Sequence, residues 1–279
     1  MHAAKVQFLS DHIGAAMPVH PLDDRLSPSN RSVERALQIL RAFRPGVGLL
    51  GNMELAERTG LARSTVSRLT QTLAENGFLD YDEESGGYRL GAPVLSLAHA
   101  LRLESVVLNF ALPVMRETAE NHRINVGLAV ADQGEMVYLE SVRRNRRELF
   151  RHVTSGSRVP IELTSLGRAY LSTLQAKKRT SWLAMARGRH PQDWPTVLAD
   201  IERSLADLRA NGYCVVSWQT GITSIAMPLG LSHLPPCVFN ISYATEDFTR
   251  EAMRTALAPL LCELVERVRN AFEATRASA

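Results

Sequence analysis

The chain has 279 residues, of which 45% are hydrophobic and 22% charged, and its formal net charge is +3. This length predicts about two domains. The composition excludes a disordered or fibrous chain. So weak a positive charge does not by itself indicate a nucleic-acid partner. The three cysteines are scattered and lack metal-ligand spacing, which argues against a disulfide framework. Because the sequence has no long apolar run and no signal peptide, we expect a cytoplasmic protein with no membrane partner.

The N-terminal third of the chain reads as a loop followed by three short helices. Residues 1–29 mix His, Pro, Ser and Asp without periodicity, so we expect a flexible arm there. Apolar residues then recur at helical spacing from Ser32, which we expect to be the N-cap of the first helix. A second helix is predicted from its cap Asn52 to Arg58, and a third over residues 63–76.

The third predicted helix has two faces of different character. Val66, Leu69 and Leu73 recur at the spacing of a buried helical face. The opposite face begins with short hydroxyl groups and arginines, which suit base edges and phosphates in the major groove of DNA. An ordinary amphipathic helix with a solvated polar face is the alternative, but the order of the three helices and a following hairpin favours a winged helix-turn-helix. The predicted DNA-contacting residues of this helix are Arg63, Ser64, Thr65, Ser67 and Arg68.

A β-hairpin is predicted in FLDYDEESGGYRLG, with its turn at residues 84–87. Residues 31–90 carry eight arginines and eight acidic residues, so this domain is neutral in total. The acidic residues cluster at 80–84, before the turn. We therefore expect the helices to supply the basic face, with only the tip of the hairpin touching phosphate, through Gly87 and Arg89.

A helical segment connects this part of the chain to the rest. Leu95, Ala98 and Leu101 recur on one face of a helix with little domain around it, which favours a dimer seam over a plain core. Pro113 is expected to interrupt the helical pattern. We predict an N-terminal arm over 1–29, a DNA-binding domain over 30–92, a linker helix over 93–108 and a second domain over 109–279.

The second predicted domain mixes strands and helices. INVGLAV and MVYLESV are β-rich segments separated by ADQGE, which predicts a hairpin over residues 124–142. A third strand is predicted over 148–154, three buried strands lie in GYCVVSW, SIAMPL and CVFNISY, and a long terminal helix is predicted over 248–274. The pattern indicates an α+β fold around a mixed or antiparallel sheet.

The sequence resembles the IclR family of bacterial transcription regulators. The motifs that carry the resemblance are SVERALQILRAF, ELAERTGLARSTVSRLTQTLAENGFL and YRLGAPVLSLA, followed by GSRVPIELTSLGRAYL, SIAMPL and VFNISY. The resemblance implies a winged helix-turn-helix joined by a linker helix to a GAF-like α/β domain that binds a small-molecule effector. It further implies a homodimer, commonly paired into a dimer of dimers, on double-stranded promoter DNA with a palindromic operator, and leaves activation or repression open.

The resemblance also implies which residues bind the effector. They precede the glycine of the GRA motif, or lie in SIAMPL and VFNISY. The family usually carries several acidic residues between the positions of Gly212 and Gly221, whereas this chain has YCVVSWQT, with none and with a tryptophan. We therefore expect an organic acid or an aromatic metabolite as the effector. The implied effector-binding residues are Thr164, Ser165, Leu166, Ser224, Asn240 and Ser242, and the departure from the family pattern adds Trp218.

Other features do not predict catalysis. RRNRRELFR, at residues 143–151, holds five arginines and is typical of a solvated hairpin loop rather than a nucleic-acid patch, with an interface or the steering of a carboxylate as lesser alternatives. His122, Glu140 and His152 match no metal-ligand spacing, and no nucleophile elbow or phosphate loop occurs. We expect no catalytic residue, no metal and no cofactor. A ligand-binding enzyme and a winged-helix protein–protein adaptor remain the alternatives.

Overall fold

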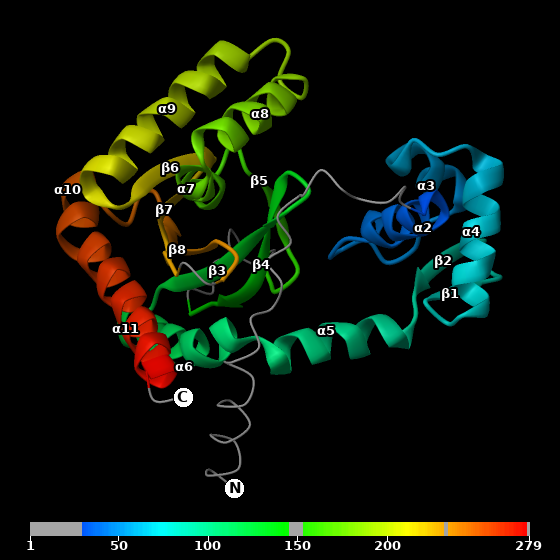
Figure 1. The fold of residues 1–279 in the computed structure, drawn as a ribbon, viewed down its shortest axis with the longest axis horizontal. Coiled ribbons are helices and arrows are strands. Elements are labelled where there is room, and N and C mark those ends of the chain that lie inside the picture. Colours follow the sequence, from blue (N-terminus) through cyan, green and yellow to red (C-terminus); the bar gives the residue numbers. More distant parts are fainter. Residues whose placement is uncertain (1–29, 145–152, 232–233, 278–279) are drawn as a thin grey trace, which may run out of the picture. The chain divides into compact units, whose positions relative to one another are not determined.

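The computed structural model describes residues 30–144, 153–231 and 234–277, and the chain divides between Ser105 and Val106 into two compact units. The prediction of an α+β fold that begins with a winged helix-turn-helix is confirmed, because three helices and a two-stranded hairpin come first (Figure 1). The elements of the first unit are α2 (Arg31–Ala42), α3 (Asn52–Thr59), α4 (Arg63–Glu75), β1 (Leu79–Asp82), β2 (Gly87–Leu90) and α5 (Ala92–Glu104).

One buried residue from each helix holds the first unit together. Ile39 of α2, Leu55 of α3 and Val66 of α4 are fully buried and belong to one apolar cluster. The hairpin joins this cluster because Leu50 and Tyr88 exchange backbone hydrogen bonds of 3.0 and 2.9 Å. Helix α4 and the hairpin therefore share a single small core.

The helix caps differ from those predicted from the sequence. The N-cap of α2 is Asn30 rather than Ser32, because the Asn30 side chain accepts hydrogen bonds from the backbone N–H groups of Ser32 and Val33. The N-cap of α3 is Gly51, and Asn52 is the first residue of that helix. Ser and Asn are both good caps, so composition alone did not separate neighbouring candidates.

The connector also differs from the predicted single helix over 93–108. α5 ends at Glu104, and α6 (Val106–His122) begins after a break at Ser105. Pro113 lies inside α6 and does not end it. Within the described residues no single helix is both long and apolar enough to cross a membrane, and α5 and α6 pass such a test only when taken together across their break.

The second unit is built around a six-stranded sheet in the order β5-β4-β3-β8-β7-β6, and every neighbouring pair is antiparallel. Its strands are β3 (Asn125–Asp132), β4 (Glu135–Val142), β5 (Arg158–Pro160), β6 (Cys214–Gln219), β7 (Ile222–Pro228) and β8 (Cys237–Ala244). Its other helices are α7 (Ser165–Thr173), α8 (Ala176–Arg187), α9 (Trp194–Asn211), α10 (Arg250–Ala252), the π-helical η2 (Met253–Leu257) and α11 (Ala258–Ala277).

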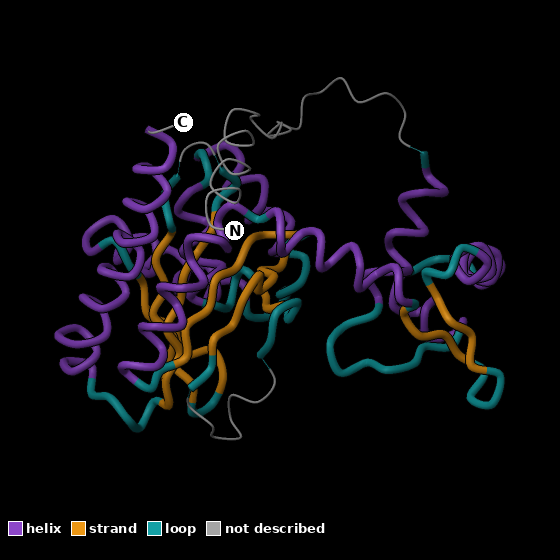
Figure 2. The backbone as a smooth tube through the Cα atoms, turned by 90° about the horizontal axis from the view of Figure 1, so that it is seen from below, coloured by secondary structure: helices purple, strands orange, loops and turns teal. Residues whose placement is uncertain are grey.

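Each face of this sheet carries its own core. α6 and α11 pack with residues such as Leu128 and Phe239 on one face. On the other face, α7, α8 and α9 pack with residues such as Ala129 and Val238. The sheet therefore lies between two layers of helices (Figure 2).

The predicted hairpin over 124–142 is confirmed, with Gln133 and Gly134 in the left-handed conformation at its turn. The predicted strand over 148–154 lies largely outside the described residues, and 153–154 are not in a strand. The third strand that the structure describes is instead β5, which pairs with β4. Its three residues are too few for the alternating pattern on which strand prediction depends.

Candidate functional site

The outer face of α4 carries the residues predicted to contact DNA. Arg63, Ser64, Ser67 and Arg68 are exposed and Thr65 is half-buried, and the opposite face of the helix is buried. The N-cap residue is Ala62, whose side chain cannot accept a hydrogen bond, so the first amides of the helix are left for another acceptor. Free amides and a positive dipole end attract anions such as phosphate. This face can therefore bind both phosphate and hydrogen-bonding base edges.

Two further residues of α4 were not predicted from the sequence. The hydroxyl of the buried Thr70 donates to Asn52 Oδ1 at 3.0 Å and so ties α4 to α3. Gln71 is exposed beside Ser67 and Arg68, and its amide nitrogen donates to Glu75 at 3.0 Å. Seven residues separate Ser64 from Gln71, so both lie on one helical face. Helical periodicity could have found Gln71, whereas nothing local indicates the Thr70 contact.

The hairpin holds its two predicted DNA contacts differently from the helix. Arg89 is about half-exposed, and its guanidinium forms an ion pair of 2.7 Å with Asp82. Hydrogen bonds from Ser85, together with the charge of Arg89, hold the pKa of Asp82 below its usual value. Gly87 is buried, and a Cβ there would lie 2.2 Å from a methyl group of Leu49. Close packing against Leu49 therefore explains why a glycine stands at position 87, and no DNA contact is needed to explain it.

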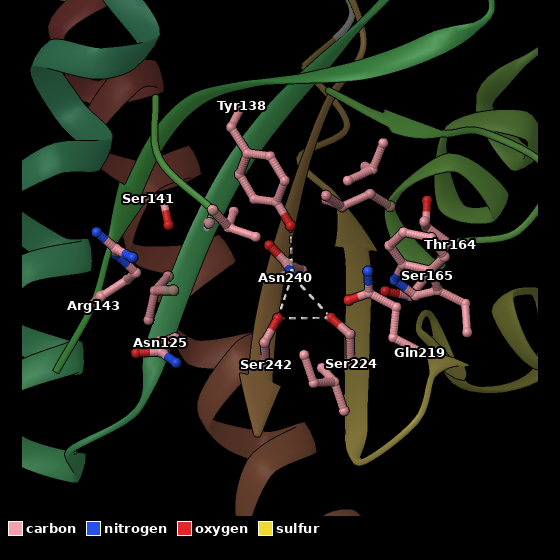
Figure 3. Close-up of a pocket in the computed structure, with 17 residues that line it drawn as sticks. Asn125, Tyr138, Ser141, Arg143, Thr164, Ser165, Gln219, Ser224, Asn240 and Ser242 are labelled. Atoms are coloured by element: carbon pink, nitrogen blue, oxygen red, sulfur yellow. Dashed lines mark hydrogen bonds between the residues drawn. The ribbon is translucent and has the colours of Figure 1, made fainter. Parts of the chain in front are cut away.

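The second unit contains a cavity between the sheet and the N-terminus of α7. It encloses about 610 Å³, counted with its opening to solvent. Thr164 to Leu166 come from the start of α7, Trp218 from β6, Ser224 from β7, and Asn240 and Ser242 from β8. The structure thus brings all seven residues of the predicted effector set together (Figure 3).

A polar cluster lies at the centre of the cavity, around the side chain of Asn240. Its amide nitrogen is 2.8 Å from Ser224 Oγ, 2.9 Å from Ser242 Oγ and 3.5 Å from the hydroxyl of Tyr138 (Figure 3). Asn240 is buried, and its amide oxygen accepts no hydrogen bond from any residue that the structure describes. A buried acceptor without a donor is costly, and a ligand that donates there would remove this cost.

Tyr138 and Gly127 complete this centre, and neither was predicted from the sequence. Burial raises the pKa of Tyr138 to about 12, so its hydroxyl keeps its proton near neutral pH. A Cβ on Gly127 would lie 2.3 Å from Asn240 Oδ1 and 2.5 Å from the Tyr138 ring. The absence of a side chain at Gly127 therefore leaves the space that both groups occupy.

The cavity has one cationic side chain among the lining residues that the structure describes. Arg143 lies with Ser141 and Asn125 at the end away from Thr164 and Ser165 (Figure 3). The other arginines of the predicted loop lie outside the described residues, apart from Arg144, which forms an ion pair with Glu120. Among the lining residues that the structure describes, none is acidic. Residues of the lining that the prediction missed are Asn125, Val126, Gly127, Tyr138, Ser141, Arg143, Val153, Val159, Gln219 and Ile222.

Buried polar contacts position the start of α7. Thr164 caps the helix by accepting a hydrogen bond from the N–H of Gly167 at 3.2 Å. The buried guanidinium of Arg168 donates to the backbone oxygen of Glu162 at 3.0 Å and to Ser204 at 3.2 Å. Burial raises the pKa of the Glu162 carboxyl, but hydrogen bonds from Arg189 and His190 outweigh burial and hold it below its usual value. The wall that carries Thr164 and Ser165 is therefore rigidly anchored.

The described residues contain no group of His, Cys, Asp and Glu side chains arranged to hold a metal ion. His152, one member of the set considered from the sequence, lies outside them. Cys214 lies behind the cavity wall, where its thiol donates to the backbone oxygen of Ser165 at 3.5 Å. Burial raises the pKa of this thiol to about 12, so it is not a reactive thiolate.

Comparison with known proteins places both units in one family. Residues 32–83 match the model of the IclR helix-turn-helix domain, and residues 101–269 match the model of the bacterial transcriptional regulator IclR C-terminal domain. The crystal structure of an IclR family transcriptional regulator from Brucella abortus is 33% identical, with a TM-score of 0.80 over 91% of this chain and 95% of that one.

Two further relatives are informative. The regulator TsaQ1/TsaQ2 of Comamonas testosteroni is 29% identical over 88% of this chain and 89% of its own length. An IclR homologue from Microbacterium hydrocarbonoxydans, solved in complex with 4-hydroxybenzoate, is 19% identical, with a TM-score of 0.67 over 87% of this chain and 99% of that one. Both family models describe transcriptional regulators. This chain belongs to the IclR family of helix-turn-helix transcriptional regulators.

Proposed function

We propose that this regulator acts in the cytoplasm, binds the palindromic operator of a promoter as a homodimer or a dimer of dimers, and changes its DNA affinity when a small metabolite occupies the cavity of the second unit. A ligand must bind two arrangements of the protein with different affinity to act as a switch. The observation that carries the proposal is the convergence of the seven effector-set residues on one cavity, in a chain whose other unit presents a polar helix face.

The proposed DNA-reading residues are Arg63, Ser64, Thr65, Ser67 and Arg68 of α4, with Arg89 at the hairpin. Arginine binds phosphate or guanine through a planar fork, and hydroxyl groups bind either phosphate or base edges. Arg68 carries no ion pair within the described residues, so it is available to DNA without breaking a contact. Arg89 must first leave Asp82, and we assign it the smaller share of the affinity.

The proposed effector is an organic acid or an aromatic metabolite. Arg143 gives the cavity a cation at one end, while Tyr138 and Trp218 provide aromatic surface. The hydroxyl and amide groups around Asn240 are suited to a hydroxyl or carbonyl group on the ligand. The 4-hydroxybenzoate bound by the Microbacterium homologue has this chemistry. It is therefore the first compound to test.

The proposed dimer contact includes α5. None of its residues is buried, and Leu95 and Leu101 are 74% and 61% exposed. Exposed apolar side chains on successive turns of one helix mark an interaction surface. A two-fold contact there matches a palindromic operator, because the symmetry of the protein sets the spacing of the half-sites.

Operator binding tests the DNA assignment. We expect Arg68→Ala to weaken binding to the natural promoter and to lower the log–log salt slope by roughly 0.9, the amount for one lost phosphate contact. Ser67→Ala should weaken binding less. Arg116→Ala, on the exposed face of α6, is the matched control and should leave binding unchanged. Equal operator affinities for all four proteins would refute the proposal that α4 contacts DNA. If the natural protein did not bind DNA even at low salt, a protein–protein adaptor would be favoured instead.

Titration with 4-hydroxybenzoate tests the cavity, with release of the operator DNA as the measured response. We expect Ser165→Trp and Gln219→Trp, which place an indole in the cavity, to abolish the response while operator binding stays intact. Gln219 is exposed, so its substitution leaves the core in place. A response that survives in both variants would locate the effector site elsewhere.

A further inference from the structure

A second groove lies at the β6 edge of the same sheet. Its volume is about 1280 Å³, counted with open solvent, and α9, β6, β7, β8 and η2 all contribute to its lining. Thr223 lines this groove, whereas its neighbour Ser224 lines the cavity described above. Consecutive strand residues point to opposite faces. The groove is therefore a separate space that shares three strands with the cavity.

A chain of three hydroxyl groups follows one wall of the groove. Ser217 Oγ lies 2.6 Å from Thr223 Oγ1, which lies 2.8 Å from Thr245 Oγ1. Each hydroxyl donates one hydrogen, so the last member of a chain of three keeps a proton that no other member accepts. The chain therefore offers one donor and several acceptor lone pairs to a molecule in the groove.

Tyr243 contributes a further donor at the floor. The residue is 5% exposed, no described residue forms a hydrogen bond with its hydroxyl, and the hydroxyl oxygen is not among the fully buried polar atoms without a partner. Its ring packs edge-on against Phe248, with 5.2 Å between the ring centroids. Burial raises the pKa of Tyr243 to about 12, so the hydroxyl remains protonated. The hydroxyl is therefore accessible from the groove, where water or a ligand can form a hydrogen bond with it.

Opposite charges complete the lining. Arg254 of η2 and Asp207 of α9 both line the groove, and neither forms an ion pair with another described residue. Arg203 also lines it, but its guanidinium is held 2.7 Å from Asp200. The groups available to a ligand are thus one guanidinium, one carboxylate, several hydroxyl groups and the aromatic surface of Phe248.

We propose that this groove is a second small-molecule site, for a zwitterion of the α-amino-acid class. Arg254 would bind the carboxylate through its planar fork and Asp207 the ammonium group. The hydroxyl groups of Thr223 and Tyr243 would hydrogen-bond the rest of the polar part. A simple anion would leave Asp207 facing a negative charge, and a simple cation would leave Arg254 facing a positive one, so charge complementarity favours a ligand that carries both.

Thermal unfolding of the full-length protein with each standard L-amino acid, followed by calorimetry, tests this site. We expect at least one amino acid to raise the melting temperature, since a ligand that binds only the folded state stabilises it. Acetate and methylamine, which carry one charge each, should not. Arg254→Met and Asp207→Asn should each weaken binding about tenfold or more. Arg209→Met and Glu202→Gln, exposed on α9 outside the groove, should bind as the natural protein does.

Three results would overturn the proposal. The first is that no amino acid raises the melting temperature. The second is that binding is unchanged in both Arg254→Met and Asp207→Asn, although these proteins unfold cooperatively. The third is that Gln219→Trp abolishes binding while the two groove variants retain it, which would place the amino acid in the cavity beside α7. Equal binding of acetate would show that the groove accepts an anion alone and would refute the zwitterion class.

Discussion

Thr70 Oγ1 of α4 lies 3.0 Å from Asn52 Oδ1 at the start of α3, and its one hydrogen is shared among this oxygen and the carbonyl oxygens of Val66 at 3.0 Å and Ser67 at 3.1 Å. Thr70 is fully buried, so this bond is shielded from water on its α4 side. This contact joins α3 to α4, and the angle between these two helices sets how the outer face of α4 is presented to DNA. The polar pair therefore has a positioning role within a core that is otherwise apolar.

Thr70→Val keeps the shape of the side chain and removes this bond. We expect the free energy of unfolding of the first unit to fall by about 1 kcal/mol, the net value of one hydrogen bond. Thr72→Val is the matched control, because Thr72 is exposed on the same helix and its hydroxyl bonds only the Arg68 carbonyl. Urea titrations of both variants measure the difference. Equal effects would show that the Asn52 contact contributes nothing beyond helix propensity.

The same residue shows where sequence reasoning stopped. Asparagine is a residue type that favours the N-cap position, and α3 does begin at Asn52. The side chain of Asn52 contacts Thr70, however, and does not cap the helix. Local propensity predicts that a helix starts there. It contains no information on a contact between residues 18 positions apart. The helices and the hairpin were therefore predictable, and the side-chain partners that fix them were not.

Asp82→Asn should release Arg89 from the hairpin. The asparagine oxygen can still accept the hydrogen bond from the Ser85 N–H, so the turn is retained while the ion pair is lost. We expect tighter operator binding and a log–log salt slope steeper by roughly 0.9, the amount for one added phosphate contact. Gel-shift titrations over a range of salt concentrations measure both quantities.

Arg89→Ala in the same background separates two causes of that gain. If the released arginine binds phosphate, Asp82→Asn should have little effect once Arg89 is absent. If affinity rises equally with and without Arg89, loss of the Asp82 charge alone explains the gain, and the hairpin does not bind phosphate through this residue.

Some of the residues that line the cavity could be predicted from the sequence, and others could not. The segments around Thr164, Ser224 and Asn240 were identified by their resemblance to family motifs, and the fold does bring them together. Gly127 belongs to β3 and Tyr138 to β4, and the hydrophobic pattern of these two strands is that of an ordinary hairpin. Only the pairing of β3 with β8, which places Gly127 opposite Asn240, reveals their role. Register between distant strands is a tertiary property that one sequence does not display.

Gly127→Ala tests this register directly. The added methyl group would lie 2.3 Å from Asn240 Oδ1, so the amide and the Tyr138 ring must move. We expect a loss of roughly 1–3 kcal/mol in the free energy of unfolding, as for other overpacked cores, together with a weakened effector response. Gly48→Ala is the control, because no atom lies within 4 Å of a Cβ at Gly48. Unfolding titrations that gave equal losses would show that the centre of the cavity tolerates a side chain.

Tyr138 makes the stability of the second unit sensitive to alkaline pH. Burial raises its pKa to about 12, from an ordinary value of about 10 in the unfolded chain. Between these values the unfolded chain has lost a proton that the folded protein still holds, so the free energy of unfolding falls as pH rises. The contribution of the neutral hydroxyl is complete below about pH 10, and roughly 1 kcal/mol of it is lost by about pH 11.

Tyr138→Phe has no proton to lose and should show a shallower decline in this window, whatever its stability at neutral pH. Tyr81→Phe, on the exposed face of β1, should decline as steeply as the natural protein. Urea titrations at several pH values above 9 measure the three slopes. If Tyr138→Phe and Tyr81→Phe lose stability in parallel, the Tyr138 hydroxyl ionises as easily in the folded state as in the unfolded one. Tyr138 would then be open to water, and the centre of the cavity would not be the desolvated environment that we assign to Asn240.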